Sequence, residues 1–190
     1  MPSRSLKPIE TPRLRLRGWL PEDVEPWARM NADPRVMEFF VGTTPRERSL
    51  EQARLLRDGL QRDGYGWFVL ELRDEPGFAG VIAVADIGWD APFEPRREVG
   101  WRLPVDRWGN GYATEGASAA LRYAFNELGW QEVVAMTATS NERSQKVMRR
   151  LGMTRNPADD FDHPRIPAGH PIRRHVLYRL RSTYVHALPR

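Results

Sequence analysis

A glycine-containing loop between a strand and a helix is the feature that most constrains how this chain folds. The apolar residues 99–103 predict a strand, and residues 114–128 predict a helix because their apolar positions recur at helical spacing. Between them, Gly109 and Gly111 lack a Cβ, so the backbone can turn tightly and present its N–H groups. The first amides of a helix have no intrahelical partner and lie at the positive end of the helix dipole. The loop therefore predicts a seat for phosphate.

The helix after this loop has a composition that suits close packing on a sheet. Gly116, Ala119 and Ala120 keep one of its sides thin. A second unit follows, with a β-rich run at residues 132–138 and a helical pattern at residues 141–153. The two units together predict a mixed α/β core.

Strands are also predicted outside this region. Alternating apolar and charged residues at 13–19 and 173–181 favour a strand near either end of the chain. Residues 66–72 and 78–85 are β-rich and are separated by an Asp-Glu-Pro-Gly turn, which predicts a hairpin. No repeat, low-complexity tract or linker divides the chain, so one domain is expected over residues 1–190.

Two helices are predicted in the first third of the chain. One begins near Pro21, where a proline and two acidic residues favour a helix start. The sequence Thr44-Pro45-Arg46-Glu47 predicts a capping box that starts a second helix, which is expected to run to about Leu60.

Composition excludes several classes of protein. Hydrophobic residues make up 41% of the chain and there are seven Trp, which favours a globular fold over disorder. The absence of Cys excludes a disulfide scaffold, a thiolate zinc site and a Cys nucleophile. The 29 basic residues are interspersed with 25 acidic ones, so no nucleic-acid partner is expected, and the net charge of +4 suits an anionic cofactor.

Neither a membrane segment nor a metal site is predicted. No stretch approaches about 18 consecutive apolar residues, and residues 1–12 contain no apolar core of signal-peptide length. We therefore expect a soluble cytoplasmic protein. The acidic and His residues at 159–175 form neither an HExxH motif nor an EF-hand loop, and prolines among them predict a loop, so no metal is expected.

Residues 98–153 resemble the acyl-CoA-binding core of the GNAT acetyltransferase superfamily. The sequence WGNGYATE at 108–115 and the pattern Asn141-x-x-Ser144 are similar to the branch that contains the ribosomal-protein N-terminal (RimJ/RimL-like) acetyltransferases. The opening TPRLRLR at 11–17 and the closing HVLYRL at 175–180 also resemble that branch. The resemblance implies the GNAT acyl-CoA N-acyltransferase fold, with a central, mostly antiparallel sheet of about six or seven strands flanked by helices.

The resemblance also implies acetyl-CoA as the acyl donor. The residues that it implies for cofactor binding are Leu103, Val105, Arg107, Trp108, Gly109, Asn110, Gly111, Tyr112, Ala113, Thr114, Asn141 and Ser144. The family's phosphate motif begins with Gln or Arg where this chain has Trp108. The backbone amides are therefore expected to be the main phosphate ligands, with the long side chain of Arg107 within reach.

Acyl transfer to an amine needs a base, and family members often place a carboxylate at the start of the strand that leads to the phosphate loop. That position here is Glu98. A modest base suffices, because an α-amino group has a pKa of about 8. The alternative is that Glu98 pairs with Arg96, Arg97 or another arginine. His163 is a second candidate for the base, and we expect it to be structural or to line the acceptor pocket.

The leaving thiolate is best protonated or hydrogen-bonded. Many GNAT enzymes use a tyrosine that aligns here with Met148, so the resemblance implies Ser144 as its substitute and Asn141 as a ligand of the pantetheine arm. The alternative is that Asn141 or Ser140 caps the helix and that Ser144 faces it.

Two functions follow from this sequence. The first is an N-acetyltransferase that uses acetyl-CoA and acts on a protein N-terminus, a peptide or a small amine by direct attack. The second is a catalytically weak acyl-CoA-binding module that regulates a partner. Phe39 and Phe40 are expected either to wall the acceptor pocket, as the resemblance implies, or to be core aromatics. Relatives are commonly monomers or dimers, so either state is compatible.

Overall fold

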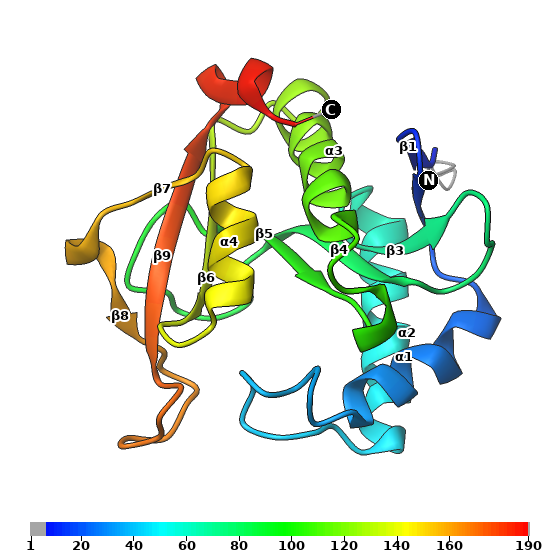
Figure 1. Cartoon of the computed structure of the whole chain (residues 1–190), viewed down its shortest axis with the longest axis horizontal. Coiled ribbons are helices and arrows are strands. Elements are labelled where there is room, and N and C mark those ends of the chain that lie inside the picture. The colour runs from blue at the N-terminus through cyan, green and yellow to red at the C-terminus, as the bar shows by residue number, and fades with distance from the viewer. Residues whose placement is uncertain (1–6, 190) are drawn as a thin grey trace.

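The computed structural model describes residues 7–189, which form one nine-stranded sheet flanked by helices (Figure 1). The strands are β1 (Ile9–Glu10), β2 (Leu14–Arg17), β3 (Gly66–Leu72), β4 (Gly80–Asp86), β5 (Arg97–Arg102), β6 (Glu132–Ala138), β7 (Thr154–Arg155), β8 (Phe161–Asp162) and β9 (Arg174–Arg181). The helices are α1 (Val24–Ala32), α2 (Arg46–Asp63), α3 (Tyr112–Asn126) and α4 (Glu142–Arg150). Short 3₁₀ turns are η1 (Pro21–Asp23), η2 (Val105–Arg107), η3 (Pro157–Asp159) and η4 (Ser182–Ala187).

The sheet confirms the predicted mixed α/β class. Its strand order is β1-β2-β3-β4-β5-β6-β9-β7, with β8 paired to β9. All pairings are antiparallel except that of β5 with β6. The six longer strands were predicted, and the two-residue strands β1, β7 and β8 are additions outside that set.

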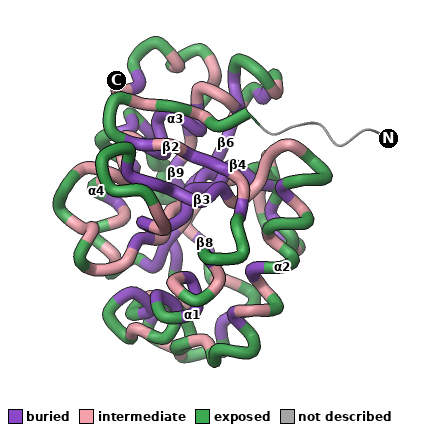
Figure 2. The backbone as a smooth tube through the Cα atoms, turned by 90° about the vertical axis from the view of Figure 1, so that its right-hand side faces the viewer, coloured by how far each residue is buried: buried purple, intermediate pink, exposed green. Residues whose placement is uncertain are grey.

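Strand alternation assigns the two faces of the sheet. On β4, Ile82 and Ala83 point to opposite faces, because successive side chains in a strand alternate. Ala83 pairs with Gly100 of β5, so the Ala83 face also carries Glu98 and Arg102. Figure 2 shows that the buried backbone follows the strands and α3.

Helix α3 lies unusually close to the Ile82 face, as its small residues predict. A Cβ on Gly116 would lie 3.0 Å from Ile82 Cγ1 and 3.2 Å from Leu70 Cδ1, which is tighter than ordinary van der Waals contact. Ala120 on the same helix is fully buried. The glycine therefore sets the distance between α3 and the sheet, and with it the position of the loop that precedes α3.

A buried ionic network fixes the connection from β2 to α1. Arg17 donates to both carboxylate oxygens of Asp23, at 2.7 and 3.0 Å, and its Nε donates to Glu71 at 2.8 Å. The Asp23 carboxylate also accepts the backbone N–H of Leu20 at 2.7 Å. These bonds anchor the start of α1, whose far end carries Asn31 to Arg102, the last residue of β5.

The predicted capping box at the start of α2 is wrong. Pro45 is the N-cap and makes no side-chain cap bond, and α2 begins at Arg46. The N–H of Thr44 instead donates to the carbonyl of Asn31 at 2.9 Å, which ties this residue to the end of α1. The helix ends at Asp63, three residues beyond the predicted Leu60, and Gly64, whose φ of 77° suits a glycine C-cap, follows it.

The packing of α3 makes a stability prediction. Gly116→Val adds a branched side chain against Ile82 and Leu70, and it should lower the free energy of unfolding by about 1–3 kcal/mol through overpacking. Gly116→Ala should fall within about 1 kcal/mol of the wild type, because better helix propensity offsets a contact that needs only a small shift. Urea denaturation measures both. Gly88→Ala is the control, since a Cβ there meets nothing within 4 Å. Equal stability of Gly116→Val and the wild type would contradict this packing.

Candidate active site

A cleft opens where β5 parts from β6. The two strands run parallel and pair at Glu98 and Val134. Beyond that pair, the ends of the two strands line a cavity of about 660 Å³, which we call the cleft. Its lining also includes parts of residues 35–41 and of α4. The start of α3 completes one end of it.

The predicted phosphate loop forms that end of the cleft. Gly109 and Gly111 have φ values of 79° and 81°, a region that favours glycine, and Gly111 is the N-cap of α3. Within residues 7–189, the backbone N–H groups of residues 109–114 have no recorded protein acceptor. They form a concave row of donors at the positive end of a 15-residue helix.

Thr114 adds a second observation at the same place. Its hydroxyl is buried, and among the described residues it has no hydrogen-bond partner, although the residue lines the cleft. Buried hydroxyls are normally paired, so an unpaired one needs an explanation. A bound anion at the α3 N-terminus would accept from this hydroxyl and from the neighbouring amides.

Residues near the N-terminal end of the chain hold this loop in place. The Glu115 carboxylate accepts from the Thr11 hydroxyl at 2.6 Å and from the Arg13 backbone N–H and Nε at 3.1 and 2.7 Å. Arg13 also donates to the carbonyl of Asn110 at 3.0 Å. Sequence reasoning gave Thr11 and Arg13 no role at the site. The co-occurrence of the TPR and WGNGYATE motifs was the only signal that linked them.

Most of the residues predicted to bind a cofactor line the cleft. They are Leu103, Arg107, Trp108, Gly109, Gly111, Tyr112, Ala113, Thr114, Asn141 and Ser144. Val105 and Asn110 are not part of this lining. The carbonyl of Val105 accepts the backbone N–H of Trp108 at 3.1 Å, and the side-chain amide of Asn110 donates to the carbonyl of Trp108 at 3.0 Å. Both residues shape the loop.

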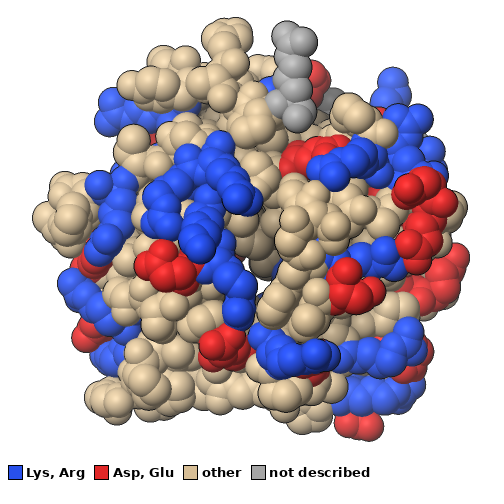
Figure 3. Space-filling view, viewed as in Figure 1, with Lys and Arg blue, Asp and Glu red and all other residues tan. Residues whose placement is uncertain are grey.

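Arg107 is already paired. Its guanidinium makes two bonds to the Glu75 carboxylate, at 2.7 and 2.8 Å, and this pairing raises the pKa of Arg107. An anion in the cleft would have to compete with Glu75 for it. Other cations lie close by, because α4 carries several basic side chains, which gather on the face seen in Figure 3. Arg143 and Lys146 of this group line the cleft.

Glu98 lies at the last paired position before the strands part, and it lines the cleft. Within residues 7–189 it makes no recorded ion pair, and burial raises its pKa to about 7. The arginines offered as alternative partners are paired elsewhere. Arg96 contacts Asp90 and Glu94, and Arg97 lies over the ring of Trp130. The Glu98 carboxyl group therefore changes its protonation state near neutral pH.

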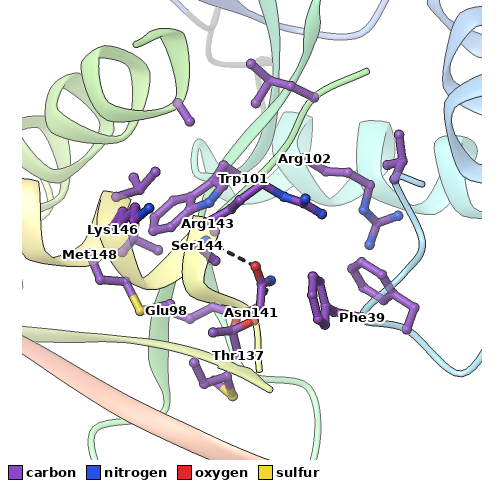
Figure 4. A pocket seen from close by; sticks show the side chains of 18 of the residues that line it. Phe39, Glu98, Trp101, Arg102, Thr137, Asn141, Arg143, Ser144, Lys146 and Met148 are labelled. Carbon is purple, nitrogen blue, oxygen red and sulfur yellow. Dashed lines mark hydrogen bonds between the residues drawn. The ribbon is translucent and has the colours of Figure 1, made fainter. Parts of the chain in front are cut away.

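Asn141 and Ser144 lie at the start of α4, facing the cleft (Figure 4). Asn141 caps the helix, because its Oδ1 accepts the Ser144 N–H at 3.1 Å, and its Nδ2 donates to the Thr137 hydroxyl at 2.9 Å. The Ser144 hydroxyl has no recorded partner in the described part of the chain. Met148, where many relatives have tyrosine, is buried one turn further along. Asn141 therefore both caps α4 and lines the cleft.

Aromatic and imidazole rings line the other end of the cleft. Phe40 is 42% exposed, so it is not a core residue, whereas Phe39 packs on a small buried cluster. His163 stacks 4.6 Å from Trp89 and 5.0 Å from His175, measured between ring centroids. Burial, with His175 and Arg165 nearby, lowers the pKa of His163 to about 4. A ring that stays neutral at pH 7 suits the expected lining role, and a group with so low a pKa is a weak general base.

Sequence reasoning missed Arg102. Its Nη1 donates to Asn31 Oδ1 at 2.7 Å, and its guanidinium lies over the rings of Phe40 and Trp27, at 4.2 and 5.3 Å. Its Nε is buried without a partner among the described residues. Burial lowers the pKa of Arg102 to about 10, so the group remains charged at neutral pH. A charged residue that ends an apolar strand was the only sequence signal.

Two further classes of feature are not found in residues 7–189. No group of three or more His, Cys, Asp and Glu side chains is placed to hold a metal ion. No helix in this part of the chain has the length and apolar character needed to cross a membrane.

Comparison with known proteins identifies the family of this chain. The sequence model of the acetyltransferase (GNAT) domain matches residues 13–154. The FsC-acetyl coenzyme A-N(2)-transacetylase of Aspergillus fumigatus is 30% identical over 161 residues, which cover 77% of this chain and 64% of that protein. This chain therefore spans less than two thirds of that relative's length.

Solved structures agree in fold. An acetyltransferase from Agrobacterium tumefaciens has a TM-score of 0.73 and 25% identity, and the match covers 93% of this chain and 95% of that one. RimL, a ribosomal alpha-N-protein acetyltransferase in complex with coenzyme A, has a TM-score of 0.73 at 17% identity, with 92% and 98% coverage. Because the domain match spans most of the sequence and the fold agrees with it, this chain belongs to the GNAT family of acetyltransferases, for which acetyl-CoA is the typical acyl donor.

Proposed function

We propose that this protein moves an acetyl group from acetyl-CoA to a primary amine by direct attack, without a covalent enzyme intermediate. The acceptor is a protein N-terminus, a peptide or a small amine. The observation that carries the proposal is Glu98, a carboxylate in the cleft that has no recorded ion-pair partner among residues 7–189 and whose pKa of about 7 suits a general base. A group of this kind favours turnover over a catalytically weak acyl-CoA-binding module.

The start of α3 is the proposed seat of the coenzyme A phosphates. The unbonded amides of residues 109–114 and the orphaned hydroxyl of Thr114 fit a phosphate group, because they supply several donors and a positive dipole. The pantetheine arm then follows the gap between β5 and β6 toward Glu98. Asn141 and Ser144 face this gap from α4.

Each step has a residue of this chain assigned to it. Glu98 accepts a proton from the ammonium group, directly or through one water, so that the free amine attacks the thioester carbonyl carbon. A carbon–nitrogen bond forms to give a tetrahedral intermediate. As this intermediate collapses, the carbon–sulfur bond breaks and the nitrogen releases its second proton to solvent. The Ser144 hydroxyl donates a hydrogen bond to the departing sulfur, and the proton that the thiolate takes up comes from solvent through this hydroxyl. No nucleophilic side chain is needed.

We also propose that residues 1–190 work as one acyltransferase domain. One sheet runs from β1 to β7 without a break, and one main hydrophobic cluster joins residues from β2, α1, α3 and β9. The 3₁₀ turn η4 near the end of the described residues packs back on α3, where Arg122 donates to the carbonyl of Leu188 at 2.6 Å.

Removal of the proposed base should abolish turnover without loss of cofactor binding. Glu98→Gln should lower kcat by about 10²–10⁴-fold, the usual contribution of a general base, and the affinity for CoA should change little. In the wild type, kcat/KM should rise with pH and level off above about 7, because only the ionised carboxylate accepts a proton. The pH dependence due to this group should be absent in the variant.

Glu94→Gln is the matched control for this experiment. Glu94 lies four residues earlier, is exposed, and pairs with Arg96 outside the cleft. Its substitution should leave both kcat and the pH profile unchanged. Wild-type turnover in Glu98→Gln would rule out Glu98 as the base, and loss of turnover in both variants would point to a structural cause.

Removal of the Thr114 hydroxyl should have different effects on the stability of the protein and on its affinity for CoA. Thr114→Val keeps the shape of the side chain and removes a buried polar group without a partner, so stability should be unchanged or slightly higher. The affinity for CoA should fall about 10-fold or more, because a hydrogen bond to a charged phosphate is lost.

Calorimetric titration with CoA and with pantetheine, which lacks the phosphates, measures this effect. Only the affinity for CoA should fall. Thr139→Val, on an exposed residue outside the cleft lining, is the control. Unchanged CoA affinity in Thr114→Val would remove this hydroxyl from the phosphate site.

A further inference from the structure

Arg102 and Glu98 lie on the same face of β5, with Gly100 between them. A strand rises about 3.3 Å per residue, so their Cα atoms are about 13 Å apart. Gly100 adds no side chain to the floor between them, and a Cβ there would already touch the indole of Trp67 at 3.4 Å. All four residues line the cleft. Gly100 and the indole of Trp67 therefore form the floor between the proposed base and the Arg102 guanidinium.

No carboxylate within residues 7–189 is recorded as a partner of the Arg102 guanidinium. Its one recorded hydrogen-bond partner in the described chain is the neutral side chain of Asn31, and its Nε has none. The aromatic rings of Phe40 and Trp27 lie against it but offer no counter-charge. A buried cation without a carboxylate is costly to the folded state, and such groups are normally paired.

Arg17, a structural arginine on the same sheet, provides a comparison because its charge is paired. Arg17 and Arg102 belong to the same row across the sheet, joined through Val69 and Val81 in register, so their side chains share a face. Arg17 bonds two carboxylates, those of Asp23 and Glu71. The difference is that Arg102 faces the cleft. Its missing partner therefore belongs to a molecule that enters the cleft.

We propose that Arg102 binds a carboxylate on the acceptor, so that the substrates of this enzyme are primary amines that carry a carboxylate several bonds away from the amino group. This inference rests on the proposed acetyl transfer. Nη1 donates to Asn31, and the rings of Phe40 and Trp27 lie 4.2 and 5.3 Å from Cζ, whereas Nε and Nη2 have no recorded partner in residues 7–189. The edge formed by Nε and Nη2 offers two parallel N–H groups, and a carboxylate matches them with its two oxygens.

The distance between Glu98 and Arg102 determines which amino acids can contact both residues. When the amine is at Glu98, a carboxylate that reaches Arg102 must lie well beyond the carbon that carries the amine. A free α-amino acid is too short to engage both groups. Chains of the length of 6-aminohexanoate, 8-aminooctanoate or triglycine suit the separation. Figure 4 shows Glu98 and Arg102 with the pocket between them and Phe39 on the Arg102 side.

The test compares acids with their own amides. The probes are 6-aminohexanoate, 8-aminooctanoate and triglycine, each against its carboxamide, with alanine as a short acid. Release of the CoA thiol gives kcat/KM for each. The wild type should prefer the acid of at least one long pair by about 10-fold or more, the value expected for a charge-assisted pair. Alanine should show no advantage over alaninamide.

Substitution of Arg102 then tests whether this residue causes the preference for acids over amides. Arg102→Met should reduce the acid-to-amide ratio of kcat/KM to near one, mainly by lowering kcat/KM for the long acids. Arg102→Lys keeps the charge without the planar fork, so it should retain part of the preference. Arg97→Met is the matched control on the same strand, since Arg97 lies outside the cleft lining, and it should keep the full ratio.

Different results would contradict the role of Arg102 and the proposed acetyl transfer. Acetylation of amines with no acid preference in any pair, or a preference that survives in Arg102→Met, overturns the role of Arg102 and leaves acetyl transfer standing. Thermal stabilisation by each probe, in the presence of CoA, is measured in parallel. The absence of both acid-selective turnover and acid-selective stabilisation across the panel also overturns it. Bound CoA without release of thiol to any amine contradicts the proposed function itself.

Discussion

The separation of β5 from β6 is the constraint on which the site depends. Each strand keeps a full antiparallel partner on its outer side, since β5 pairs with β4 along its length and β6 pairs with β9. The inner edges meet at Glu98 and Val134 and then part. The sheet remains cohesive, yet the ends of both strands lose ladder partners on the side facing the cleft. Backbone groups at such an edge bond readily to an extended chain that enters between the strands.

Desolvation in this cleft acts on two charges with opposite results. It raises the pKa of Glu98 to about 7, and it lowers that of Arg102 to about 10. Near neutral pH the first group is poised to exchange a proton, while the second stays a fixed cation. They lie four positions apart on β5, and no ion pair between them is recorded, so they do not neutralise each other. Among residues 7–189, Glu98 has no recorded cationic partner and Arg102 has no recorded carboxylate partner. An amine that carries a carboxylate would complement both groups.

Burial of Glu98 also links the site to stability. The pKa of Glu98 is 4.5 in the unfolded chain and about 7 in the native state. Between these two pH values the native state therefore holds a proton that the unfolded chain has released. Native stability therefore decreases as pH rises from about 4.5 to about 7, where the folded carboxyl also ionises. The reactive ionisation state is thus less stable than the protonated one, and the surrounding sheet and α3 must hold Glu98 in place.

The sequence indicated much of this architecture, because its strongest signals are local. The strand, glycine loop and helix around Gly109 and Gly111 form as predicted, since positive φ angles and a helix start depend on neighbouring residues. The capping box at Thr44 failed because a tertiary bond to Asn31 took the backbone N–H instead. The environment of Arg102 also depends on Asn31, 71 residues away, and on Phe40, so no local pattern encodes it. Lone charges on strands are common, and only the assembled fold distinguishes paired Arg17 from unbalanced Arg102.

Ligand-dependent thermal unfolding tests the central claim most directly, namely that the cleft between β5 and β6 and the start of α3 form a coenzyme A thioester site. The protein is titrated with acetyl-CoA, CoA and, as a phosphate-bearing comparison, ATP. Ligand at 100 times its dissociation constant should stabilise the native state by about 2.7 kcal/mol. We expect this stabilisation with acetyl-CoA and CoA but not with ATP. No stabilisation by acetyl-CoA or CoA at millimolar concentration would contradict the account, because the amides of residues 109–114 would then form only a turn.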